Sequence, residues 1–268
     1  AVEPETQFKN LEKSIQCGKN TISEYDKKIP SDLTAEQILI RSGNIGSVRI
    51  AQAIGLEKFK NFLDKLSLIS AIKFDIEEVG IPVSFKWGKC KLATTSYGHG
   101  ITTTILQLAN AYSIIVNGGY KINPTLIKQK SKIKNKKILN NDISKKINPI
   151  LRKIVSTKEG TASLANVDGY QVGGKTGTAQ TSMVGGYSNK KINTFASVFP
   201  TSNPKYVFIV MLDEPKTNSE YIYNYRDGSG IKYKGTPFNT AGWTSVEVVG
   251  QIIEKIGPIL ATKYNEVY

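Results

Sequence analysis

The sequence predicts an α+β fold, in which an antiparallel sheet is flanked by a cluster of helices. Apolar residues recur at helical spacing in several segments before position 156, and they indicate the helices. From Gly169 onward, short strand-like runs are separated by turn signals such as Gly185-Gly186 and Ser202-Asn203-Pro204. Runs of this kind with tight connections are typical of an antiparallel meander.

Polar caps and glycine stops set the bounds of the expected helices. Residues 1–30 are expected to form loops and turns, and Ser31 or Thr34 then caps a helix that halts near residues 42–44. A loop is expected at 96–100, and an amphipathic helix closes the chain over roughly 246–259. A second helix is expected at roughly 45–54, with Gly55 as its C-terminal stop, and a third at 57–66. An apolar helix should begin near Thr103 or Thr104 and end at Gly118. A further helix should run from its cap, Asp142, to about residue 154.

Composition limits the classes of protein that this chain can belong to. It has 268 residues, of which 40% are hydrophobic and 22% charged, as in ordinary soluble globular proteins. The longest apolar stretch, 206–212, is too short to span a bilayer. Cys17 and Cys90 are too few for a disulfide framework or a metal site, and His99 is the single histidine. We therefore expect neither a zinc centre nor a His-dependent triad.

The net charge of +14 comes mostly from lysine. The densest cluster lies between Lys128 and Lys146, in a stretch without aromatic residues. A nucleic-acid interface would interleave basic residues with aromatic ones or place them on one helix face. We expect a solvated basic insertion at about 128–146 and no nucleic-acid partner, and attraction to an anionic surface or polymer is the alternative.

One segment, GYQVGGKTGTAQTSMVGG at 169–186, matches two motifs. Gly169 to Thr176 fits the phosphate-loop pattern G-x-x-x-x-G-K-[ST]. Lys175-Thr176-Gly177 is also the K-T-G triplet of the serine acyl-transfer enzymes that penicillin inhibits. The first motif predicts an ATPase, and the second predicts a cell-wall enzyme.

The context of the segment argues against the phosphate loop. That motif needs a buried strand before it and a helix directly after it, because the helix N-terminus holds the phosphates. Here Gly177 follows at once, Gly185-Gly186 arrives before three helical turns can form, and 162–168 is not a continuous buried strand. The apolar run that ends at Asp213 imitates a magnesium-binding strand, but we interpret it as a central strand that reaches the surface.

The K-T-G triplet needs an edge strand beside a cleft, and the residues fit one. Gly173 and Gly174 allow close backbone approach, and Gly177 lets substrate lie against the strand. A Ser-x-Asn motif should precede it, after a helix. Ser42-Gly43-Asn44 lies in such a place, between two expected helices. Alone this motif is weak, since a helix-capping turn also explains it, but the pair in this order is more specific.

Together these segments resemble the transpeptidase domain of class B penicillin-binding proteins, especially the septal, cell-division type. The resemblance covers nearly the whole chain. It is strongest at 38–51, 96–100, 106–109, 111–112 and 173–180. Residues 195–200 and 213–215 look like the family's next two strands.

The resemblance implies a peptidoglycan D,D-transpeptidase that cross-links stem peptides during septal wall synthesis through a serine acyl-enzyme. Such an enzyme needs no cofactor, because acyl transfer requires a nucleophile, a proton relay and an oxyanion hole. The implied partners are D-Ala-D-Ala stem peptides, β-lactams as inhibitors, and membrane proteins of the division machinery. The implied location is the periplasmic face of the inner membrane, with the anchor outside this chain.

The resemblance also assigns roles to single residues. Ser42 and Asn44 would line the cleft, with Ser42 in the proton relay to the leaving group, and Lys175 would tune that relay electrostatically. Thr176 and Thr178, with Gly177 between them, would bind the carboxylate of the substrate or of penicillin. The backbone N–H of Thr178 would supply half of the oxyanion hole.

The family's Ser-x-x-Lys nucleophile precedes the Ser-x-Asn motif, and no Ser-x-x-Lys stands before Ser42 in this chain. Thr6 and Lys9 have the right spacing between them, but the family's serine lies roughly fifty to sixty residues before Ser-x-Asn, and Thr6 is much closer to Ser42. We therefore expect a chain that begins just after the catalytic helix and cannot be acylated alone. A Ser-x-x-Lys roughly ten to twenty residues upstream of Ala1 would support this expectation.

Three alternatives to the transpeptidase stay open at the level of sequence. The first is a non-catalytic scaffold of the division machinery with the same fold. The second is a serine β-lactamase or β-lactam sensor, although the 106–108 helix and the Lys-rich insertion look more like the transpeptidases. The third is the ATPase. The sequence does not distinguish a septal from an elongation-specific enzyme, and it does not identify the acceptor amine.

Overall fold

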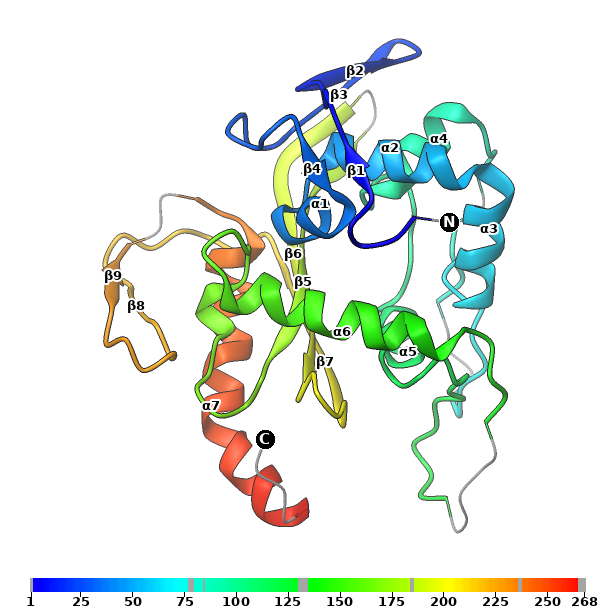
Figure 1. Cartoon of the computed structure of the whole chain (residues 1–268). Coiled ribbons are helices and arrows are strands. Elements are labelled where there is room, and N and C mark those ends of the chain that lie inside the picture. Colours follow the sequence, from blue (N-terminus) through cyan, green and yellow to red (C-terminus); the bar gives the residue numbers. More distant parts are fainter. Residues whose placement is uncertain are drawn as a thin grey trace. The chain divides into compact units, whose positions relative to one another are not determined.

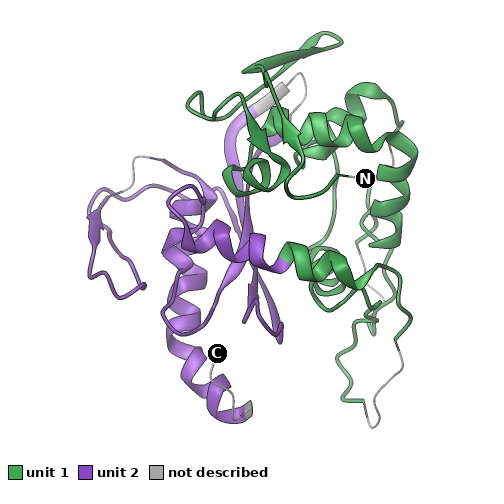
Figure 2. Cartoon of the chain, in the orientation of Figure 1, with its two compact units in different colours: residues 1–147 green, residues 148–268 purple. Residues whose placement is uncertain are grey.

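The chain forms two units, residues 1–147 and residues 148–268, which are drawn in green and purple in Figure 2. The computed structural model describes residues 2–76, 80–83, 85–129, 135–183, 186–235 and 238–264. Helix α6 (Asn141–Ser156, labelled in Figure 1) contains the point of division, so Figure 2 draws it partly green and partly purple.

The first unit is mainly helical, as the sequence predicts. Thr34 caps α1 with a full capping box, in which Thr34 Oγ1 accepts from Gln37 N at 3.1 Å. Thr104 caps the apolar helix in the same way, and Gly55, at φ +84°, ends the second helix. These helices are α1 (Ala35–Arg41), α2 (Asn44–Ile54), α3 (Leu56–Lys65), α4 (Lys89–Ser96) and α5 (Ile105–Val116).

Three features of this unit differ from what the sequence led us to expect. Residues 1–30 are not only loops, because they contain β1 (Gln7–Phe8) and the hairpin of β2 (Ser14–Cys17) and β3 (Asn20–Ser23). Strand β1 pairs with β4 (Leu33–Thr34). Helix α4 was not expected, since its sequence KCKLATTS is largely polar. The side chain that caps the first turn of α6 is Asn140, whose Oδ1 accepts from Asp142 N, and not that of Asp142.

Small apolar clusters hold these elements together. Ile45 and Val48 of α2 pack with Ile22 of β3 and Ala93 of α4, and all four are buried. Ile38 of α1 lies within 2.6 to 2.8 Å of where a Cβ on Gly46 would stand, so only glycine allows α1 and α2 to approach this closely. Another cluster contains Leu66, Ala111, Ile114 and Leu139.

The second unit contains the predicted antiparallel meander. Strands β5 (Gly173–Met183), β6 (Gly186–Phe199) and β7 (Tyr206–Asp213) pair in the order β5-β6-β7. Helix α7 (Ser245–Tyr264) packs on β6 and β7 with its buried face, and Phe195 of β6 is fully buried. Among the described strands β6 is therefore central and β7 lies at an edge, which corrects the expectation of a central strand ending at Asp213.

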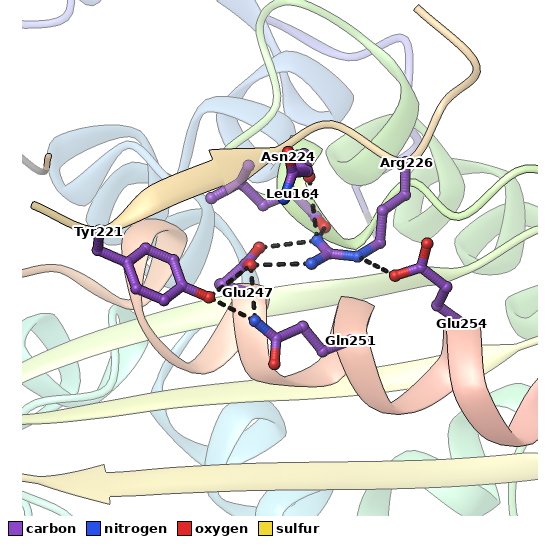
Figure 3. A network of polar contacts seen from close by, with 7 residues as sticks. All are labelled: Leu164, Tyr221, Asn224, Arg226, Glu247, Gln251 and Glu254. Atoms are coloured by element: carbon purple, nitrogen blue, oxygen red, sulfur yellow. Dashed lines mark hydrogen bonds and ion pairs between the residues drawn. The ribbon is translucent and has the colours of Figure 1, made fainter. Parts of the chain in front are cut away.

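A buried ion pair fixes the loop between β8 (Ile222–Asn224) and β9 (Lys232–Lys234) to α7, as Figure 3 shows. Arg226 donates to both carboxylate oxygens of Glu247, at 2.7 and 2.8 Å, and each side chain is only 5% exposed. Arg226 also donates to Glu254 and to Leu164 O, and Tyr221 donates to Glu247. Charges buried this deeply are tolerated because their hydrogen bonds are satisfied.

Candidate active site

The Lys-Thr-Gly segment is extended, as the transpeptidase interpretation requires. Lys175 lies in β5 opposite Ala196, and Thr176 lies opposite Phe195. The strand continues to Met183 without a helical turn, and η1 (Ser163–Ala165) stands where a phosphate loop would need its buried strand. Both findings contradict the ATPase, because no helix N-terminus follows Lys175 to hold phosphates.

Strand β5 is an edge strand among the described strands, since it pairs only with β6. Every second residue of such a strand directs its backbone N–H and C=O away from the sheet. An extended peptide can therefore hydrogen-bond to this edge. Gly177 and Thr178 are exposed there, and a Cβ on Gly177 would meet only Thr194, at 3.9 and 4.0 Å. The exposure of Gly177 and Thr178 leaves this part of the edge accessible to a bound chain.

The two glycines before Lys175 are needed for packing within this unit. A Cβ on Gly173 would lie 2.4 Å from the Thr201 methyl group and 2.8 Å from the Leu151 carbonyl carbon. A Cβ on Gly174 would lie 2.5 Å from Ala196 O. The close backbone approach that the sequence predicts at these two glycines is therefore to α6 and β6. These two elements hold β5 in position.

Lys175 is half-buried, and its Nζ donates to Thr176 O at 2.9 Å. Burial lowers the pKa of its ammonium group from 10.5 to about 8, because a charge loses hydration in a less polar environment. A lysine with a pKa near neutrality can both carry charge and exchange a proton at physiological pH.

The threonine hydroxyls that follow have fixed partners outside the motif. Thr176 Oγ1 lies 2.7 Å from Thr161 Oγ1. Thr178 Oγ1 accepts from the backbone N–H of Ala241 at 3.0 Å, at the start of η2 (Ala241–Trp243). Sequence analysis missed Thr161 and Ala241, because residues 15 and 63 positions away leave no local pattern.

The Ser-x-Asn motif forms the junction of α1 and α2 in the first unit. Ser42 ends α1 in the left-handed conformation, at φ 58° and ψ 40°, Gly43 caps α2, and Asn44 is its first residue. A serine in this region carries backbone strain of about 1 to 2 kcal/mol, which is often found at functional positions.

Residues 23–25 form hydrogen bonds to the α1–α2 junction on both of its sides. Ser23 O accepts from Asn44 Nδ2 at 2.8 Å, which fixes the orientation of the Asn44 amide because a carbonyl can only accept. The Glu24 carboxylate accepts from the backbone N–H groups of Asn44 and Ile45, at 2.8 and 2.9 Å. Tyr25 donates to Arg41 O at 2.7 Å. Residues 23–25 therefore brace the turn, and sequence analysis missed them as well.

The predicted site residues are thus shared between the units. Ser42 and Asn44 belong to the first unit, and Lys175, Thr176, Gly177 and Thr178 belong to the second. The structure brings together the residues of each set. That the two sets face one another across one cleft stays a prediction.

Other residues considered from the sequence have these places in the structure. Thr6 and Lys9 do not share a helix, since residues 4–5 form a turn and β1 follows, which supports rejecting Thr6 as the nucleophile. His99 is half-buried against the Tyr97 ring, at 4.8 Å between centroids. Burial lowers the pKa of His99.

The Lys-rich segment 128–146 is only partly described, because residues 130–134 lie outside the described residues. Its later part includes the buried Leu139 and the first turns of α6. Lys146 pairs with Glu3 at 2.6 Å on the surface. The extent of an insertion here therefore stays a prediction.

Cys17 and Cys90 form a disulfide that sequence analysis did not predict. Their Cα atoms are 5.5 Å apart, and the bond joins β2 to the N-terminal turn of α4. Within the described part of the chain no group of three or more His, Cys, Asp or Glu residues is arranged to hold a metal ion. No described helix has both the length and the apolar character that crossing a membrane requires.

The fold is that of transpeptidase domains of penicillin-binding proteins. The solved transpeptidase domain of penicillin-binding protein 3 from Burkholderia pseudomallei superimposes with a TM-score of 0.79 over 96% of this chain and 73% of that one, at 24% identity. Penicillin-binding protein 3 from Mycobacterium tuberculosis, solved in complex with ampicillin, gives a TM-score of 0.77 over 98% of this chain and 58% of that one, also at 24% identity.

The chain belongs to the Transpeptidase family, described as the penicillin binding protein transpeptidase domain, whose model matches residues 1–229. A relative from Caulobacter vibrioides, named probable peptidoglycan D,D-transpeptidase FtsI, is 29% identical over 92% of this chain and 41% of its own length. The FtsI homolog from Mesostigma viride is 30% identical over 96% of this chain and 44% of its own length. The chain thus spans less than half the length of these two relatives.

Proposed function

We propose that this chain is part of a peptidoglycan D,D-transpeptidase that cross-links stem peptides during septal wall synthesis. One observation carries the proposal beyond family membership: Lys175–Thr178 form the accessible edge of a sheet, where an extended peptide can lie. Two relatives that match most of the chain are named as D,D-transpeptidases of the FtsI group, which supports the septal assignment.

The reaction is a double acyl transfer. A serine hydroxyl attacks the carbonyl carbon of the bond between the two D-Ala residues, the terminal D-Ala leaves with the proton, and the acyl group remains on the serine as an ester. The amine of a second stem peptide then attacks the ester, forms the cross-link and releases the serine. The nucleophile is a Ser-x-x-Lys serine outside this chain.

The residues of this chain bind the substrate and move the proton. Thr176 and Thr178 hold the terminal carboxylate at the β5 edge, and the Thr178 N–H supplies half of the oxyanion hole. Ser42, positioned by the brace of residues 23–25, passes the proton to the leaving amine, and Asn44 lines the cleft. The ammonium group of Lys175 adds the positive charge that favours the anionic substrate.

β-Lactams act at the same site, because their carboxylate and strained amide imitate the D-Ala-D-Ala terminus. The Cys17–Cys90 disulfide supports a location in an oxidising compartment, such as the periplasmic face of the inner membrane. Membrane proteins of the division machinery are the proposed partners there.

The test is to incubate the full-length gene product with a fluorescent penicillin and to map the labelled peptide. We expect one labelled serine in a Ser-x-x-Lys motif upstream of Ala1, and release of D-Ala from a stem-peptide donor together with a cross-linked product. The 268-residue chain alone should not be labelled. Absence of label from the full-length protein would instead favour a non-catalytic scaffold. Rapid hydrolytic loss of the label would favour a β-lactamase, and a stable label without a cross-linked product would favour a sensor.

A further inference from the structure

Thr161 lies outside the Lys-Thr-Gly motif but directly behind it. Its hydroxyl oxygen is 2.7 Å from that of Thr176. The backbone around Thr161 has little freedom, because a Cβ on Gly160 would lie 2.0 Å from Ile154 O and a Cβ on Gly242 would lie 2.7 Å from Thr161 O. The turn is therefore wedged between α6 and η2, and it holds the Thr161 hydroxyl in one place.

Thr178 is held from the other side by an equally fixed donor. The Ala241 N–H donates to Thr178 Oγ1 at 3.0 Å. The segment that contains Ala241 is tied to β6 by the fully buried Asn193, whose Nδ2 donates to Asn239 Oδ1 at 3.0 Å and to Thr244 Oγ1 at 2.9 Å. A hydroxyl that accepts an N–H in this way has its own proton left to donate.

Thr176 and Thr178 are two residues apart on one strand, so their side chains point to the same face. Toward a carboxylate, which can only accept, the hydroxyl of Thr178 acts as a donor. The hydroxyl of Thr176 does so only if Thr161 donates to it, because the Thr161–Thr176 bond uses the proton of one partner or the other. The direction of that single hydrogen bond decides whether this face presents two donors or one.

We propose that Thr161 is a positioning residue that donates its hydroxyl proton to Thr176 and thereby directs the Thr176 proton to the substrate's carboxylate. The inference rests on the proposed function. Hydrogen bonds in a chain polarise one another, so a Thr176 hydroxyl that accepts from Thr161 is also a stronger donor to an anion. Two aligned donors favour a carboxylate over the corresponding ester, which carries no negative charge.

The experiment compares benzylpenicillin with its methyl ester on the full-length gene product. Second-order acylation rates are measured by competition with a fluorescent penicillin for the wild type and for Thr161→Val, Thr161→Ser and Thr157→Val. Thr161→Val keeps the shape but removes the hydroxyl, and Thr161→Ser restores it. Thr157→Val is the matched control, because Thr157 directly follows α6 and its hydroxyl donates to Lys153 O of that helix at 2.8 Å rather than to the Lys-Thr-Gly motif.

We expect Thr161→Val to lower the acid-to-ester rate ratio roughly tenfold, which corresponds to the loss of about one hydrogen bond to a charged group. Thr161→Ser and the Thr157→Val control should keep an acid-to-ester rate ratio within about threefold of the wild-type ratio. That change is much smaller than the roughly tenfold loss expected for Thr161→Val. The ratio does not depend on how much of a sample is folded. An equal loss for acid and ester, or no change in either, would overturn the role of Thr161.

The same experiment separates this inference from the proposed function. A wild-type protein that is acylated by benzylpenicillin while Thr161→Val keeps the wild-type ratio would contradict only the positioning role. A wild-type protein that forms no acyl-enzyme would contradict the proposed function, and the inference with it.

Discussion

Lys175 occupies an unusual position for a lysine, since it is half-buried in an edge strand and burial lowers its pKa to about 8. Between about pH 8 and pH 10.5 the unfolded chain keeps a proton on this residue that the folded chain has lost. Stability rises with pH wherever the unfolded state binds more protons. Below about pH 8 both states are charged, and the full cost of burying the ammonium group is present.

We therefore expect the free energy of unfolding of the full-length protein to rise, relative to a Lys175→Met variant, by at most about 3 kcal/mol between pH 8 and pH 10.5. Urea denaturation at several pH values measures this difference. Lys175→Arg is the control, because its guanidinium stays charged throughout this range. A wild-type curve that runs parallel to that of Lys175→Met would show that the lysine is not desolvated.

At the scale of single residues, the sequence predicted the local conformations that short motifs determine. It missed the hydrogen-bond partners that lie far away in the chain. The extended conformation of Lys175–Thr178 and the position of Ser42-Gly43-Asn44 between two helices follow from nearby residues. Glu24, Thr161 and Ala241 each reach the predicted site residues through one or two hydrogen bonds to a backbone group or a hydroxyl. A contact of that kind places no demand on spacing, so no pattern in the sequence records it.

The elements of the second unit depend on the buried network around Arg226. This guanidinium connects the β8–β9 loop to α7 through Glu247, and it also donates to Leu164 O in η1 (Figure 3). Breaking a buried ion pair leaves the other charge without compensation, which usually costs 3–5 kcal/mol. A pair replaced on both sides by apolar residues often costs much less.

We expect Arg226→Met to destabilise the full-length protein by about 3–5 kcal/mol, and the double variant Arg226→Met with Glu247→Leu to recover most of that loss. Thermal denaturation gives the order of the three proteins. Lys234→Met is the matched control, because its pair with Glu220 is exposed and should contribute less than about 1 kcal/mol. A double variant less stable than Arg226→Met alone would mean that Glu247 is stabilised mainly by Tyr221 and Gln251.

Elements with strong local signals were predicted, and elements that depend on tertiary contacts were not. The capping boxes at Thr34 and Thr104 and the connection between β6 and β7 are short-range features. The short strands within residues 1–30 and helix α4 have few apolar residues, and they exist because of pairing and burial against α2. The central position of β6 could not be read from its own sequence, since strand order is a property of the sheet.

At the scale of the whole molecule, the sequence motifs, the family match and the fold agree. The motifs predicted a transpeptidase domain of a penicillin-binding protein, and the match over residues 1–229 confirms it. Two cysteines in 268 residues, by contrast, gave no reason to expect a bond between them, because their separation of 73 residues has no local signature. That bond bears on the compartment in which the molecule folds.

The Cys17–Cys90 bond closes a long loop, and in the chain-entropy account a loop of this length stabilises the folded state by about 4 kcal/mol. It also fixes the β2–β3 hairpin, whose last residue and Glu24 hold Asn44. We therefore expect reduction, or Cys17→Ser with Cys90→Ser, to speed amide hydrogen exchange in α2 and α4 of the full-length protein.

Protein purified from an oxidising compartment should yield the cross-linked peptide by mass spectrometry and should leave both cysteines unalkylated. Reductant should have no further effect on the double variant, which separates loss of this bond from other actions of the reagent. Two alkylated thiols in the native oxidised protein, or unchanged exchange in both helices, would exclude a stabilising bond here and remove its support for a periplasmic location.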